Sequence, residues 1–182
     1  MLSIIDLRLE ARFQNSVHNI EKPMTPLLKT MIFLLIVPVT GVILIPRWIL
    51  LSGWNRSFEI GNWNLLGSPL IALGAAALLW CFWDFATIGK GTPAPIDPPK
   101  VFVSRGLYRW TRNPMYVALG FIIIGQAIFF ESWTLLIFAA CIWTIQHLFV
   151  ILYEEPALKQ KFGPEYESYL KAVPRWIPKR PK

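Results

Sequence analysis

Four stretches of the chain are apolar over a length that matches the hydrocarbon core of a lipid bilayer. This pattern predicts membrane-spanning helices over residues 31–51, 65–83, 114–130 and 133–153. Pro38, Gly41 and Pro46 lie within the first stretch, which favours a kinked helix. Only Glu131 and Ser132 separate the last two stretches, so these two helices are expected to form a tight antiparallel hairpin.

The composition of the chain also indicates a membrane protein. Of its 182 residues, 54% are hydrophobic and 16% are charged, whereas about a quarter of the residues in soluble domains are charged. The net charge of +7 would suit nucleic acid only if a soluble fold presented a basic face. Cys81 and Cys141 lie inside apolar stretches, so no disulfide framework or metal site is expected. We therefore predict an all-α polytopic integral membrane protein that binds neither nucleic acid nor metal.

Positive charge is concentrated on one side of this predicted topology. The connection between the second and third helices carries five Lys and Arg residues, and the segment after the fourth helix carries seven. Because cytoplasmic segments of membrane proteins are enriched in these residues, both termini and the long connection are expected to face the cytoplasm. The membrane would be the inner membrane if the chain is bacterial.

The chain is expected to form a single membrane domain over residues 1–182, in three parts. Residues 1–30 form an interfacial or flexible segment, because their apolar residues recur at helical spacing among charged ones. Residues 31–87 hold two spans. Residues 88–182 form a cofactor-binding catalytic region that ends in short cytoplasmic helices.

Four residues are expected to shape the tail after the fourth helix. Pro156 lacks a backbone N–H, so it is predicted to bend or restart the helix there. Gly163 followed by Pro164 predicts the end of one helix and the start of another. Trp176 is expected to anchor the tail at the membrane surface.

Polar side chains gather where the predicted hairpin opens toward the cytoplasm. His147 and Glu154 share one face of the fourth helix, and the start of the third helix carries Asn113 and Tyr116. Polar groups in or beside membrane spans are costly, so their convergence favours a functional site. Each also has a structural explanation, since Asn113–Pro114 suits a helix start and His147 suits a hydrogen-bonded packing residue.

Two motifs on either side of the hairpin carry a family resemblance. The segments GLYRWTRNPMY (106–116) and EEPALKQKFGPEYESYLKAVPRWIP (154–178) together resemble the membrane methyltransferases of the isoprenylcysteine carboxyl methyltransferase and phospholipid methyltransferase superfamily. The resemblance covers residues 91–178 and implies an all-helical fold that uses S-adenosylmethionine. Asn113 stands where the family motif has His, and Val150 stands where the isoprenylcysteine enzymes have an Arg for the substrate carboxylate.

The resemblance also implies which residues form the site. The cofactor-binding residues would be Lys100, Val101, Phe102, Val103, Tyr108, Asn113, Pro114, Met115, Tyr116 and Glu154. His147 and Glu155 are the candidate proton acceptors for an amine or thiol substrate. Arg112 completes the predicted catalytic set, within a basic rim that would bind the cofactor carboxylate.

The function expected from these residues is methyl transfer to a lipophilic acceptor at the cytoplasmic membrane face. The acceptor would be a carboxylate, a thiol or a lipid amine, and membrane lipids are the expected surroundings. One alternative is an NADPH-dependent membrane sterol or steroid reductase, whose tail normally carries Arg-Asp where this chain has Glu154 and Glu155. The other alternative is a membrane scaffold without catalytic activity.

Overall fold

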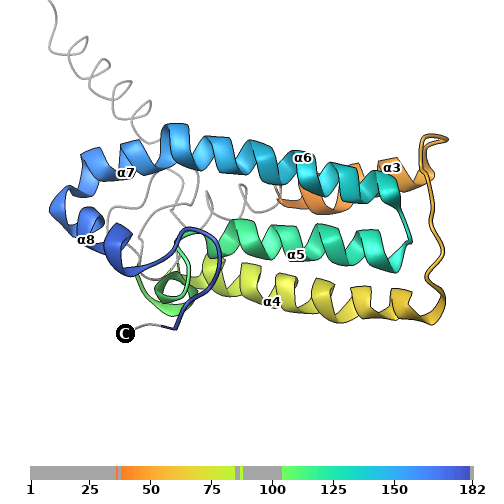
Figure 1. Ribbon diagram of the computed structural model, residues 1–182, viewed down its shortest axis with the longest axis horizontal. Coiled ribbons are helices and arrows are strands. Elements are labelled where there is room, and N and C mark those ends of the chain that lie inside the picture. Colours follow the sequence, from red (N-terminus) through yellow and green to blue (C-terminus); the bar gives the residue numbers. More distant parts are fainter. Residues whose placement is uncertain (1–35, 37, 85–86, 88–103, 181–182) are drawn as a thin grey trace, which may run out of the picture.

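The computed structural model describes residues 36, 38–84, 87 and 104–180, and this part of the chain is helical (Figure 1). In chain order the elements are η1 (Thr40–Leu44), α3 (Ile45–Leu51), η2 (Gly61–Leu66), α4 (Gly67–Asp84), η4 (Gly106–Arg109), α5 (Pro114–Phe129), α6 (Trp133–Phe149), η5 (Val150–Glu154), α7 (Glu155–Phe162) and α8 (Pro164–Ala172). The elements named η are short π or 3-10 helices. Within these residues the only β-type pairing is an isolated bridge between Ser57 and Ser132. The all-α prediction is confirmed for this part of the chain.

Two helical segments have the length and composition to cross a membrane. They are Gly61–Asp84 and Trp133–Phe162, while Thr40–Leu51 and α5 are shorter apolar helices. Large apolar side chains on the outer surface of the long segments, such as Trp83, are more than half exposed. A wide exposed apolar surface of this kind suits contact with lipid. The structure thus supports a membrane protein, whereas the four-span arrangement and its orientation remain predictions.

Helices α4 and α5 pack closely because glycines face each other across their contact. A Cβ atom built on Gly125 would lie 2.8 Å from the backbone oxygen of Gly67, and one built on Gly74 would lie 2.7 Å from that of Ala118. Small residues let two membrane helices approach until their backbones touch. Leu78 and Phe82 belong to the buried cluster that extends this contact toward the other end of α4.

Replacing Gly125 with alanine is therefore expected to destabilise the protein by about 1–3 kcal/mol, because the added methyl group meets backbone that cannot yield. Gly120 in the same helix is the matched control, since a Cβ there lies 3.9 Å from Trp143, an ordinary contact distance. Thermal unfolding in detergent measures both variants. Equal melting temperatures for Gly125→Ala and Gly120→Ala would show that the close contact is not formed.

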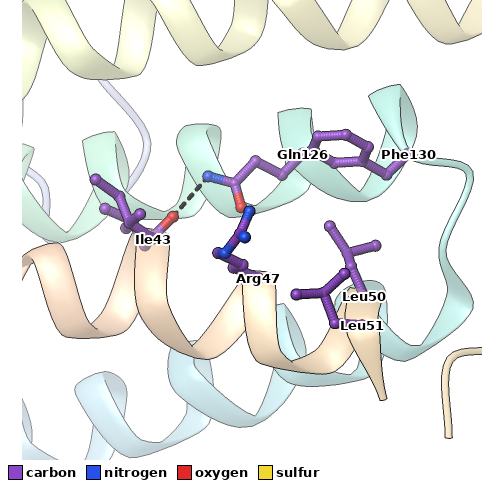
Figure 2. Close-up of a pocket in the computed structure, with 7 residues that line it drawn as sticks. Ile43, Arg47, Leu50, Leu51, Gln126 and Phe130 are labelled. Atoms are coloured by element: carbon purple, nitrogen blue, oxygen red, sulfur yellow. Dashed lines mark hydrogen bonds between the residues drawn. The ribbon is translucent and has the colours of Figure 1, made fainter. Parts of the chain in front are cut away.

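A polar side chain of α5 compensates for a proline in α3. Pro46 has no N–H to donate to the carbonyl of Val42, four residues earlier. Gln126 Nε2 donates to that carbonyl oxygen at 2.7 Å, the bond drawn dashed in Figure 2. It lies beside a groove of about 540 Å³ between the two helices, which Arg47 and Phe130 help to line. The irregularity predicted for the first apolar stretch takes the form of the π turn η1 before Pro46.

We expect the Gln126→Leu variant to lose about 1–3 kcal/mol of stability, because the Val42 carbonyl is then left unpaired. In a Pro46→Ala background, the new N–H of residue 46 can reach the same carbonyl, so the Gln126 substitution should cost much less. The two costs are compared by thermal or denaturant unfolding in detergent. An equal cost in both backgrounds would contradict the proline explanation.

The short link between α5 and α6 is held by the loop that follows α3. Glu131 has a positive φ of 50°, which lets the chain reverse at once. Its backbone oxygen accepts the N–H of Phe58 at 2.8 Å, and its Oε1 accepts that of Ile60 at 2.9 Å. Ser132 Oγ caps α6 by accepting the N–H of Leu135 at 3.1 Å. Helices α5 and α6 thus lie side by side (Figure 1), with the start of one near the end of the other.

Of the two outcomes predicted at Pro156, a bend or a restart, the fourth helix does not show a restart. Helical structure continues from Trp133 to Phe162, because the π turn η5 widens the helix just before the proline. There the N–H of Glu155 bonds to the oxygen of Val150, five residues earlier. The predicted stop about two turns further on is confirmed: Gly163 has a φ of 52°, and α8 begins at Pro164.

Candidate active site

Two arginines from distant parts of the chain bind one carboxylate. Glu155 Oε1 accepts from Arg112 Nη1 at 2.9 Å and from Arg175 Nε at 2.7 Å, while Oε2 accepts from Arg175 Nη2 at 2.9 Å. The Glu155 and Arg112 side chains are 16% and 13% exposed, so the group is largely shielded from solvent. The bond to Glu155 raises the pKa of Arg175 above its usual value. This network joins the start of α5, the start of α7 and the tail.

The neighbouring acid, Glu154, faces α5. Its Oε2 accepts a hydrogen bond from Tyr116 Oη at 2.9 Å. A regular α-helix would turn two consecutive residues by 100° from each other. Here both carboxylates point into the same region, since Tyr116 and Arg112 belong to the same short stretch of chain. The convergence predicted for the hairpin is thus present, and it includes Glu155 as well as Glu154.

The tail runs beside the segment that precedes α5, as the dark blue and green parts of Figure 1 show. The N–H of Arg112 donates to Pro174 O at 2.9 Å, and the N–H of Lys179 donates to Trp110 O at 2.9 Å. Asn113 Nδ2 donates to Arg175 O at 3.1 Å. Asn113 therefore precedes the helix, as predicted, but its side chain makes no capping bond and holds the tail instead.

Trp176 lies in an aromatic cluster, while its role as a membrane-surface anchor stays a prediction. Its ring centroid is 4.6 Å from that of Trp143 and 6.4 Å from that of Tyr116. Its Nε1 donates to Nδ1 of His147 at 3.0 Å. An indole N–H can only donate, so Nδ1 of His147 must be the acceptor, and its lone pair is occupied. His147 thereby holds Trp176 beside Tyr116, the hydrogen-bond partner of Glu154.

Three tyrosines, Tyr108 of η4 and Tyr166 and Tyr169 of α8, form one wall of the site, which we call its floor. Tyr108 is buried at 8% exposure, and its backbone oxygen accepts from Tyr169 Oη at 2.7 Å. Burial raises the pKa values of Tyr108 and Tyr169, and it raises the pKa of Tyr166 to about 12. These phenols therefore stay protonated near neutral pH, and that of Tyr169 acts as a donor. Met115 packs against Tyr108 and Cys81.

An acid that the sequence analysis did not single out lies next to this floor. Asp84 ends α4 and is 7% exposed, and its Oδ2 has no hydrogen-bond partner among the described residues. A Cβ on Gly106 would collide with that carboxylate, and Gly106 also has a φ of 57°. Both the collision and the positive φ require glycine at position 106, which explains the glycine that begins the motif GLYRWTRNPMY. The signal in the sequence was an acid at the end of an apolar helix.

Several residues that the sequence analysis discussed take no part in this hydrogen-bond network. Lys100, Val101, Phe102 and Val103 lie outside the described residues. Pro114 is buried as the first residue of α5. Val150, which replaces the arginine of the isoprenylcysteine enzymes, is buried at 1% exposure. Arg175 supplies a guanidinium to the site from the tail instead, as its bonds to Glu155 show.

Comparison with known proteins identifies the family. The model of the family described as phospholipid methyltransferase matches residues 63–165, more than half of the chain. The match includes α4, α5 and α6 and both carboxylates of the site. A search of curated proteins found no match. The chain therefore belongs to the phospholipid methyltransferase family, part of the superfamily of membrane methyltransferases that its two motifs resemble.

Proposed function

We propose that this protein transfers a methyl group from S-adenosylmethionine to a lipophilic acceptor at the cytoplasmic face of a membrane. Membership of the family supports methyl transfer to a lipid or similar acceptor over the reductase and scaffold alternatives. The observation that carries the proposal is the convergence of Glu154, Tyr116 and the arginine-bound Glu155 at one end of the helix pair.

The side chains present fit the charges of S-adenosylmethionine. Its ammonium and sulfonium groups are cations, which suit the Glu154 carboxylate and the faces of the Trp143 and Trp176 rings. Its carboxylate suits a guanidinium donor. Arg112 Nε is buried and has no hydrogen-bond partner among the described residues, so it can provide one. Tyr116 would orient Glu154 through the bond at 2.9 Å.

Glu155 and His147 fit positioning roles better than the role of a base. Both oxygens of Glu155 accept bonds from guanidinium groups, so Arg112 and Arg175 already occupy the carboxylate. The Nδ1 lone pair of His147 is used by Trp176. We therefore propose that Glu155 fixes the two arginines and that His147 fixes the indole.

Little acid–base chemistry is then required of the protein. When bound, S-adenosylmethionine supplies a methyl group already activated by a positive sulfur. The residues around it have to align the acceptor with that methyl group and keep water away. The aromatic cluster of Tyr116, Trp143 and Trp176 suits the exclusion of water, because it presents apolar ring faces beside the carboxylate.

The proposal is tested by following tritiated methyl transfer with the detergent-purified protein. A total membrane lipid extract, a panel of thiols and a prenylcysteine analogue are offered in parallel as acceptors. Label in one of the three identifies the acceptor class. If no acceptor is labelled, S-adenosylhomocysteine does not bind in calorimetry, and NADPH raises the melting temperature, the proposal is wrong and the reductase reading is correct.

A further inference from the structure

A second polar cavity lies next to the candidate active site, shares Tyr169 with the floor of that site, and is lined by cations. It has a volume of about 370 Å³ and lies between η4, the end of α8 and the tail. Arg109, Lys171, Lys179 and Arg180 line it together with the hydroxyl-bearing Ser104. None of the described lining residues is acidic, and none belongs to the network around Glu154 and Glu155.

The charge of this cavity is not balanced within the part of the chain that the structure describes. None of its four cations forms an ion pair with a described residue. The nearby acid Glu167 is bound to Lys159 at 2.9 Å. Lys159 lowers the pKa of Glu167 most, and Lys171 lowers it less. Glu167 does not line the cavity, so its charge is directed mainly at Lys159. Four like charges around one hollow repel each other, and an anion placed among them would relieve that repulsion.

Exposed apolar side chains on the same segments suit the surface of a membrane. Trp110 follows Arg109 directly and is 44% exposed, and Ile177 precedes Lys179 in the tail and is 81% exposed. The bond from the Lys179 N–H to Trp110 O ties these two segments together. Tryptophan and aliphatic side chains beside lysine and arginine are typical of the depth at which lipid headgroups lie.

We propose that this cavity binds the phosphate of an anionic phospholipid headgroup, at a site distinct from the one where methyl transfer is proposed. The cations come from η4, α8 and the tail, so the cavity is complete only when the tail is docked. A lipid bound there would hold the tail, and with it Arg175, against the start of α5. The proposal does not depend on which acceptor is methylated.

Native mass spectrometry of the full chain in detergent tests the proposal, with dioleoylphosphatidylglycerol and dioleoylphosphatidylcholine as the lipid probes. We expect the wild-type protein to retain the anionic lipid at least about tenfold more tightly than the phosphatidylcholine. Each cation near a membrane surface contributes several-fold to the affinity for an anionic lipid. The variant Lys171→Gln/Lys179→Gln should lose this preference. The control Arg105→Gln/Lys161→Gln removes the same charge outside the cavity and should keep it.

Other outcomes would overturn the proposal in distinguishable ways. Equal retention of the two lipids, or an unchanged preference in the Lys171/Lys179 variant, would show that the cavity does not select an anionic lipid. Displacement of the lipid by millimolar inorganic phosphate would assign the cavity to a soluble anion. Displacement by S-adenosylhomocysteine would assign it to the cofactor. Calorimetry with S-adenosylhomocysteine on the Lys171/Lys179 variant distinguishes the two sites. The variant should bind S-adenosylhomocysteine with the same affinity as the wild type.

Discussion

Replacing Glu154 with glutamine is expected to weaken the binding of S-adenosylhomocysteine at least tenfold. A hydrogen bond between a carboxylate and a cationic donor contributes about 1.5–3 kcal/mol, which corresponds to roughly ten- to hundredfold in affinity. Glutamine has the same size and its amide oxygen can still accept from Tyr116, so the local structure should persist. Isothermal titration calorimetry with the detergent-purified protein measures the change.

Two further variants make this result specific to Glu154. Glu167→Gln is the same chemical change at an exposed acid of α8 and should leave the affinity unaltered. Tyr116→Phe removes the bond to Glu154 but keeps its charge, so it should cause a smaller loss than Glu154→Gln. Unchanged binding after both Glu154→Gln and Glu154→Ala would remove Glu154 from the cofactor site.

The helices of this fold were predictable because their signals are local. The apolar stretch after Pro114 became α5 and the one after Ser132 became α6, close to the predicted limits. Proline at the first position of a helix and glycine after its end act through the backbone of their own residues. For the same reason, Gly163 and Pro164 marked the boundary between α7 and α8. The restart considered at Pro156 is absent because a π turn can absorb a missing donor without a break in the helix.

The part of the site contributed by the tail was less predictable, because it depends on contacts between residues far apart in the chain. The sequence neighbours of Trp176 give no sign of its partners, which are Trp143 and His147 in α6. The docking of Arg175 is likewise set by Glu155 and by the amide of Asn113. Hydrophobic periodicity contains no information on such pairs. The family resemblance pointed to the acidic pair, and the geometry added the arginines that bind it.

The Glu155→Leu variant is expected to release the tail from the helix pair. Without the carboxylate, Arg112 and Arg175 become two close and uncompensated positive charges. Breaking a fully buried ion pair costs about 3–5 kcal/mol, and because the Arg175 side chain is 32% exposed we expect roughly half of that. Hydrogen exchange measures the release of the tail directly. The Arg112 N–H donates to Pro174 in the tail, and the Lys179 N–H of the tail donates to Trp110. Both should exchange faster, and methyl transfer should fall with them.

A double substitution separates the charge effect from the loss of a side chain. Glu155→Leu/Arg175→Leu removes one acid and one cation, so the net charge of the group stays at one positive, as in the wild type. If repulsion between the guanidiniums releases the tail, the double variant should protect the Lys179 amide better than Glu155→Leu alone. If Arg175 instead contributes mainly by packing, the two losses should add, and the double variant should exchange fastest. That result would leave the bonds from the Asn113 side-chain amide and the Arg112 backbone N–H as the main restraint on the tail.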